Sequence, residues 1–154
     1  MPFDSSTRNK LSHMVSDARK ILTTEFTAQM QEIHGIQPDG TVIEISKLTH
    51  LDNEEYEISK ALREKIDHVV GGLTSDKKQI DSAINRIIHE EAFTVLNRFA
   101  ALRMCEERGL IQESVRAGMK SKGFLVYSTI CGSGLGTIFE RYKTYLCCLF
   151  DEIA

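Results

Sequence analysis

The chain contains no tryptophan and only two prolines. It also lacks a long apolar run: a helix that spans a bilayer needs roughly 20 consecutive apolar residues, and no segment approaches that length. The first ten residues, MPFDSSTRNK, are polar and carry no hydrophobic region of a secretory signal. These absences argue against a membrane or secreted protein and predict a cytoplasmic chain with no membrane partner.

Cysteine is scarce as well, with four residues in 154, and none has the paired spacing of a zinc site. Cys147 and Cys148 are adjacent, so on a helix they point in different directions and suit packing better than metal binding. The five histidines are scattered, without a partner three or four residues away. This pattern predicts buried structural thiols and no metal site.

No strong excess of one charge is present, because the formal net charge is −3. That balance argues against a stand-alone DNA-binding protein held by phosphate contacts. Residues 108–143 are nevertheless mildly basic, with six bases against two acids. The bases are Arg108, Arg116, Lys120, Lys122, Arg141 and Lys143. Arg116, Lys120 and Lys122 are therefore candidates for contacting a DNA backbone, although a chance asymmetry on a solvated surface explains the same pattern.

What the chain does contain is helical periodicity. Apolar residues recur at three- and four-residue steps from Leu11 to Ile33, which predicts a helix that begins near a cap at Ser5 or Ser6 and ends at Gly35. Because this stripe is nearly a heptad seam, it favours pairing with another helix, either within the chain or in a homodimer.

The same reasoning predicts three more long helices and a short amphipathic piece at residues 112–119. Their expected boundaries are a cap at Asp52 or Asn53 to Gly71-Gly72, near Ser75 to Gly109, and from the capping box Thr137-x-x-Glu140 onward. The segment TVIEISKL has β character, which predicts at most a short β element near residues 36–48. The fold class is therefore mostly α, a single-domain bundle of four to five helices over residues 1–154.

A glycine-rich segment, Cys131-Gly-Ser-Gly-Leu-Gly136, follows FLVYSTI and precedes the last helix. A strand, a glycine loop and a helix in this order form a nucleotide-binding or S-adenosylmethionine-binding turn. Such a site also needs a complete βαβ unit and an acid at the end of the next strand, for which the remaining residues leave no room. A glycine connector is the better interpretation.

The segment Glu90–Gly109, EEAFTVLNRFAALRMCEERG, is apolar on nearly every side yet carries several polar residues. A helix of this kind is expected at the centre of a bundle. There Arg98 falls among apolar residues and needs a partner, and Arg103 lies one turn from Glu107. Two interpretations stay open for Asn97, Arg98, Arg103 and Glu107: a structural polar network that fixes helix register, or a contact to another domain or to a DNA backbone.

Within this segment, LNRFAALRMCEERGLIQES resembles the "NR-apolar-LR-x-x-E-x-x-G-Leu/Tyr" helix near the N-terminus of large adenine-specific DNA methyltransferases. That family includes the BREX phage-defence methyltransferase PglX and the type IIG restriction-modification enzymes. The similarity covers most of residues 8–118 and is strongest at residues 92–111. The resemblance implies a non-catalytic N-terminal helical module that precedes and braces a methyltransferase domain.

Family members catalyse methyl transfer in a Rossmann-like domain with a glycine-rich S-adenosylmethionine motif and an Asn-Pro-Pro-Tyr/Phe loop that receives a flipped adenine. Neither proline of this chain, Pro2 or Pro38, follows an asparagine. The resemblance therefore implies no catalytic, cofactor-binding or metal-binding residue here. It implies S-adenosylmethionine as cofactor of the parent enzyme, and as partners the remainder of the methyltransferase and, through it, DNA.

The last helix reaches Ala154 without a cap, glycine or proline. This ending favours the expectation that the chain is the N-terminal portion of a longer protein. The alternative is a complete small helical adaptor or regulatory protein that acts through protein–protein interaction.

Overall fold

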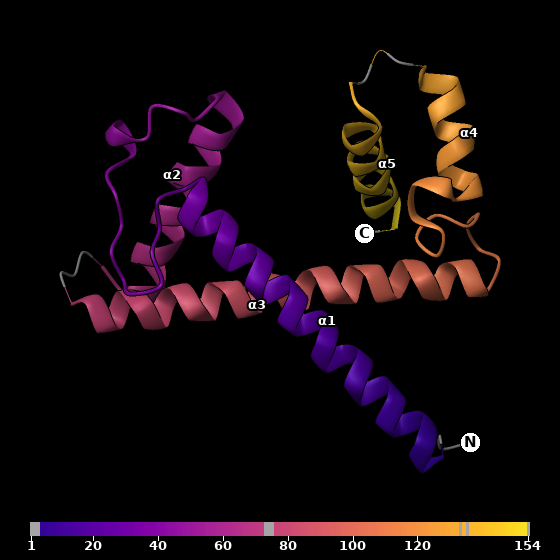
Figure 1. The fold of residues 1–154 in the computed structure, drawn as a ribbon, viewed down its shortest axis with the longest axis horizontal. Coiled ribbons are helices and arrows are strands. Elements are labelled where there is room, and N and C mark those ends of the chain that lie inside the picture. Colours follow the sequence, from indigo (N-terminus) through magenta and orange to yellow (C-terminus); the bar gives the residue numbers. More distant parts are fainter. Residues whose placement is uncertain (1–3, 73–75, 133, 135, 154) are drawn as a thin grey trace. The chain divides into compact units, whose positions relative to one another are not determined.

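The computed structural model describes residues 4–72, 76–132, 134 and 136–153, which are predominantly helical. Five α-helices occur in this part of the chain (Figure 1): α1 Ser5–Glu32, α2 Asn53–Val70, α3 Lys77–Glu107, α4 Lys122–Cys131 and α5 Ile138–Ile153. Two short 3₁₀ helices, η1 Ile45–Lys47 and η2 Gly118–Lys120, lie between them. The prediction of a mostly α chain with four to five helices is confirmed. The elements group into two compact units, residues 1–94 and 95–154, and α3 contributes to both.

Capping residues set the ends of the helices in the first unit. Asp4 caps α1 by accepting a hydrogen bond of 2.6 Å from the backbone N–H of Thr7. The prediction of a cap at Ser5 or Ser6 is therefore wrong, because Asp4 already satisfies this donor. For α2 the prediction is confirmed: Asp52 and Glu55 form a capping box, with hydrogen bonds of 2.7 and 3.1 Å. Gly71 ends that helix in the left-handed conformation at φ 85°.

The connection between α1 and α2 contains an isolated antiparallel bridge, Ile36–Val42. A short β element near residues 36–48 is thus confirmed. TVIEISKL does not continue as a strand, because its second half winds into η1. The turn at residues 37–40 is held by Thr41, whose backbone N–H donates to Asp39 at 2.9 Å.

The core of the first unit lies where α2 and α3 meet the end of α1. Its buried members are Met30, Ile36, Ile66, Ala83, Ile84, Ile87 and Ile88. From α2, Ile66 belongs to this cluster, and Leu62 and Val69 pack against it. Ile58, on the same helix, is 43% exposed, whereas the neighbouring Ser59 is buried.

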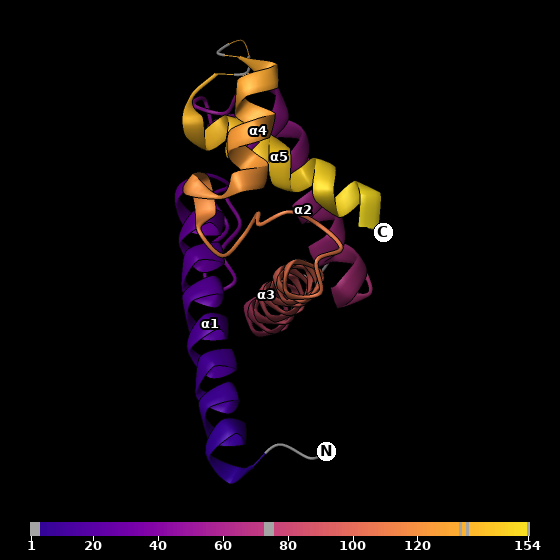
Figure 2. The same cartoon turned by 90° about the vertical axis from the view of Figure 1, so that its right-hand side faces the viewer.

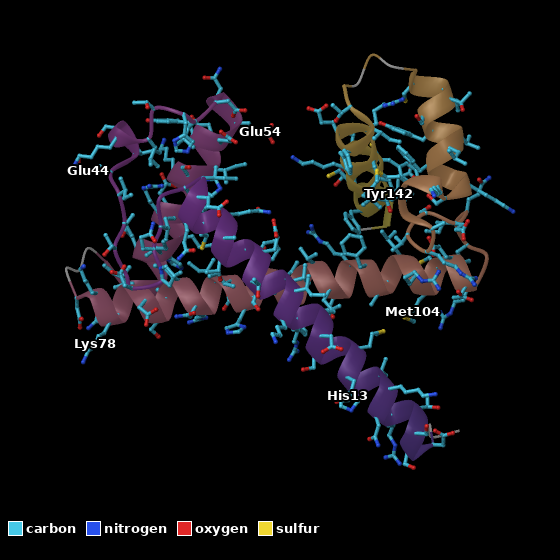
Figure 3. The ribbon with its side chains drawn as sticks, in the orientation of Figure 1. His13, Glu44, Glu54, Lys78, Met104 and Tyr142 are labelled. Atoms are coloured by element: carbon cyan, nitrogen blue, oxygen red, sulfur yellow. The ribbon has the colours of Figure 1, made fainter. Side chains whose placement is uncertain are left out.

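Helix α1, seen along its whole length in Figure 2, contributes to this core through its C-terminal half. Of its described residues only Met30 is buried. On the N-terminal half, Leu11, Met14 and Ile21 are 46%, 56% and 68% exposed. His13, labelled in Figure 3, lies on this same exposed half. The apolar stripe predicted for this helix therefore reaches well beyond the core.

The second unit combines the end of α3 with α4 and α5, which lie side by side (Figures 1 and 2). FLVYSTI forms α4, not the strand that precedes a nucleotide-binding turn, and Gly132, at φ 60°, caps the helix. The glycine connector falls partly on residues 133 and 135, which lie outside the described residues. The capping box of α5 is confirmed, because Thr137 N–H donates to Glu140 at 2.5 Å and Glu140 N–H to Thr137 Oγ1 at 3.3 Å.

The buried hydrophobic side chains of this second unit come from all three helices: Leu102, Phe124, Tyr145 and Leu146. At the start of α5, Ile138 and Phe139 are 44% and 69% exposed although both are apolar. No helix among the described residues is long and apolar enough to cross a membrane.

Candidate functional site

The polar residues that were predicted to be buried within residues 90–109 are accessible to solvent on α3. Asn97 and Arg98 are exposed on α3, whereas Leu102, one turn further, is buried. The Arg98 guanidinium lies 5.7 Å from the centroid of the Phe150 ring. The prediction of a helix buried on all sides is wrong, because in this stretch α3 buries one face, and Met104, labelled in Figure 3, is 53% exposed.

Arg103 forms the ion pair that its spacing predicts. Its guanidinium lies 2.6 Å from the Glu107 carboxylate, and the two side chains are 34% and 61% exposed. An ion pair this accessible contributes little to stability, because solvent screens it. Arg103 also donates to Glu106, which lies three residues further along the helix. This second partner was not predicted.

Glu106 is the more deeply placed acid, with a side chain that is 4% exposed. Besides Arg103, it accepts hydrogen bonds from the backbone N–H groups of Ser114 and Val115. Burial alone would raise the pKa of Glu106, but these three donors outweigh burial and lower it. The carboxylate thus fixes the turn after α3 to the end of that helix. The three-residue spacing of Arg103 and Glu106 could have predicted their ion pair. It gives no indication of the hydrogen bonds from the backbone of Ser114 and Val115.

Two tyrosines of α5 continue this network. Ser114 Oγ lies 2.6 Å from the Tyr145 hydroxyl, and the Tyr142 hydroxyl donates to the Ser114 carbonyl at 2.9 Å. The Phe124 ring packs on both tyrosines, at centroid distances of 5.0 and 5.8 Å. Burial, followed by the nearby charge of Glu106, raises the pKa of Tyr142, which Figure 3 labels on α5. Ser114 is 0% exposed and Tyr145 8%, so this cluster holds the fold together and is closed to a substrate.

The first unit has its own buried polar network. His34 Nδ1 lies 2.6 Å from Ser59 Oγ. Arg63 donates to three backbone carbonyls, those of Ser59 at 2.7 Å, His34 at 2.9 Å and Ile43 at 2.7 Å. Burial and then the charge of Arg63 lower the pKa of His34. A histidine beside a serine suggests nucleophilic chemistry, but Ser59 is 0% exposed, so the pair instead anchors the connection after α1 to α2.

The bases predicted to contact DNA lie within η2 or close to its ends. Arg116, Lys120 and Lys122 are all exposed. Arg141, from the same basic segment, is engaged within the unit: it donates to Ser128 Oγ at 2.8 Å and to the Gly132 carbonyl at 3.1 Å. Arg116, Lys120 and Lys122 therefore form an accessible basic cluster on the second unit.

The cysteines differ from the prediction of buried thiols. Cys105 and Cys131 are half-buried, but Cys147 and Cys148 are exposed. That prediction is wrong for the adjacent pair, because Tyr145 and Leu146 occupy the buried face of α5 just before it. Within the described part of the chain, no three His, Cys, Asp or Glu residues come together in a way that could hold a metal ion.

Comparison of the chain with protein-family models, with curated proteins and with solved structures gives no match. The relation of residues 92–111 to adenine-specific DNA methyltransferases therefore stays a prediction from the residues themselves.

Proposed function

We propose that the chain is a non-catalytic N-terminal helical module of an adenine-specific DNA methyltransferase or restriction-modification protein in phage defence. In this role it braces the methyltransferase domain or contacts DNA or a partner, and the parent enzyme supplies the S-adenosylmethionine site. The pattern of residues 92–111 supports the choice of family, and the exposed apolar side chains of the second unit support a docking role.

One observation carries the docking role: the second unit exposes large apolar side chains beside polar ones. Met104, Leu110, Ile130 and Phe139 are 53%, 70%, 80% and 69% exposed. These exposed apolar side chains are available to a docking partner, and their number on one small unit supports an interaction role. On α3, exposed Asn97 and Arg98 add polar groups that can fix the register of a docked domain.

The nucleotide sequence after the Ala154 codon tests this proposal. We expect an open frame that continues into a glycine-rich S-adenosylmethionine motif and an Asn-Pro-Pro-Tyr/Phe motif. A frame that stops at once, or that continues into a domain of another class, would overturn the methyltransferase assignment.

A second candidate is an adaptor that dimerises through α1. It is favoured by the exposed residues Leu11, Met14 and Ile21, which follow heptad spacing with the half-buried Ala18. Light scattering on the purified chain separates the two candidates. A stable dimer that Ile21→Glu converts to a monomer would favour the adaptor, and a monomer would remove it.

The docking role also predicts that Arg98 contributes little to the stability of the chain by itself. We expect Arg98→Met to change the free energy of unfolding by less than about 1 kcal/mol, because an exposed arginine gains little from one contact with a ring. Urea unfolding followed by circular dichroism measures this change.

Leu102→Ala is the matched control on the same helix. Leu102 is 1% exposed, and its truncation should cost about 2–5 kcal/mol. Loss of cooperative unfolding in Arg98→Met would instead show that the arginine belongs to a core network and would remove its docking role.

A further inference from the structure

A second accessible surface lies on the first unit where α1 passes α3. A cavity of about 420 Å³ opens there. Its lining residues are Arg19, Thr23, Arg86, His89, Glu90, Ala92 and Phe93. The Arg19 guanidinium lies 5.8 Å from the centroid of the Phe93 ring, and this ring is 51% exposed. The cavity therefore presents an accessible aromatic ring beside a cation.

The charges around this cavity favour an anion. Glu90 is its one acid, and it is paired with Arg86 at 2.8 Å. The hydrogen bond from Arg86 lowers the pKa of Glu90, so the pair is intact at neutral pH. The neighbouring Lys65–Glu91 pair, at 2.6 Å, is neutral as well. Arg19 remains as an uncompensated positive charge, and His89 can donate hydrogen bonds beside it.

The cationic surface continues along α1. A shallow groove of about 460 Å³ shares Arg19 with the cavity, and its lining residues are Arg8, Leu11, Ser12, Val15, Ser16 and Arg19. From Arg8 to Arg19 the helix rises about 16 Å at 1.5 Å per residue. Asp17 lies about 160° around the helix from Arg19, at 100° per residue, so its charge faces away from the groove. Arginines thus stand at both ends of a groove that carries two serine hydroxyls.

We propose that this surface binds a single strand of DNA, with phosphates on Arg8 and Arg19 and one base stacked on Phe93. The choice of DNA as the polymer rests on the proposed function; the site itself rests on the cavity, the groove and their charges. Single-stranded nucleic acid is bound by cations that follow the backbone and by aromatic rings that stack on bases. An acidic peptide would use the arginines but would leave the exposed ring of Phe93 without a partner.

Fluorescence anisotropy of a labelled twelve-nucleotide oligo-dT strand, titrated with the full chain at several salt concentrations, tests the proposal. We expect Phe93→Leu to weaken binding about 5- to 150-fold, the range for loss of one base–aromatic stack. The double variant Arg8→Gln, Arg19→Gln should reduce the slope of log K against log salt by about 1.4, because each phosphate contact to a single strand contributes about 0.7.

The matched control is the double variant Lys10→Gln, Lys78→Gln, which removes two exposed charges from the same two helices outside the cavity and the groove. It should bind like the unmodified chain, and circular dichroism confirms that each variant is folded. Absence of binding, tighter binding of duplex than of the strand, or equal losses in control and site variants would overturn the proposal.

A further variant separates this site from the proposed function. If Arg116→Gln, Lys120→Gln, Lys122→Gln abolishes binding while the cavity variants bind normally, DNA is contacted by the second unit and the cavity assignment is wrong. The reading frame after Ala154 tests the methyltransferase assignment independently of either result.

Discussion

Gly40→Ala should lower the free energy of unfolding of the chain by about 2–5 kcal/mol. Gly40 has φ 80°, a left-handed conformation that costs a residue with a Cβ about 1–2 kcal/mol. An added Cβ would also lie 2.3 Å from the carbonyl oxygen of Lys77 and 3.2 Å from the backbone nitrogen of Asp81. These are backbone atoms at the start of α3, which cannot rotate away as a side chain can, and overpacking of this kind costs about 1–3 kcal/mol more. Urea unfolding measures the loss.

Gly71→Ala provides the control for backbone strain alone. Gly71 has φ 85°, close to that of Gly40, but an added Cβ there would have no atom within 4 Å. Its loss should therefore be about 1–2 kcal/mol, the cost of the left-handed conformation without the clash. Equal losses in the two variants would show that the turn at Gly40 moves away from α3 without cost, and the close packing of that turn would be wrong.

The same turn shows what could be predicted from the sequence. Pro38, Asp39 and Gly40 identify a turn through local chemistry, because each residue type favours a particular backbone conformation. The capping boxes at Asp52 and Thr137 are local in the same sense. The packing of this turn against Lys77 is a contact between residues far apart in the sequence. No short-range sequence pattern predicts such a contact.

The apolar pattern of α3 explains why its residue Arg98 was wrongly predicted to be buried. Its apolar residues surround the helix axis, so periodicity alone assigns no outward face. The structure buries Ala92 and Leu102 but leaves Phe93 and Met104 about half exposed. Apolar character is a one-way guide, since much of the surface of any folded protein is apolar. Arg98 thus lies at the surface although it stands within an apolar run.

The buried networks were harder to predict than the helices. Tyr145, Ser114 and Ser59 are polar residues at positions where the helical pattern expects solvent or a turn. Their burial depends on partners 25 to 31 residues away, such as His34 for Ser59 and Tyr145 for Ser114. Spacing within one helix carries no information on such pairs, so these residues were missed.

Glu106→Gln should destabilise the chain by about 2–4 kcal/mol at pH 7. The substitution keeps the shape of the side chain but removes the charge that three donors share: Arg103 and the N–H groups of Ser114 and Val115. Hydrogen bonds to a charged group are worth about 1.5–3 kcal/mol each, and a glutamine keeps one acceptor oxygen for these donors. Glu107→Gln is the control, because that acid also pairs with Arg103 but is 61% exposed and should cost at most about 1 kcal/mol.

The effect of Glu106→Gln should also depend on pH. The folded state lowers the pKa of Glu106 below its ordinary value of 4.5, so its contribution is complete above that value and is lost as the pH falls through the folded pKa. The lowered pKa values of Asp4, Asp39, Glu90 and Glu140 act in the same direction. They are common to both proteins, so the difference between the unmodified chain and Glu106→Gln isolates Glu106. That difference should be constant from pH 7 to about 5 and shrink in more acidic solution, because a protonated Glu106 resembles the glutamine. A difference that does not change with pH would show that Glu106 stabilises the chain through packing and not as a carboxylate.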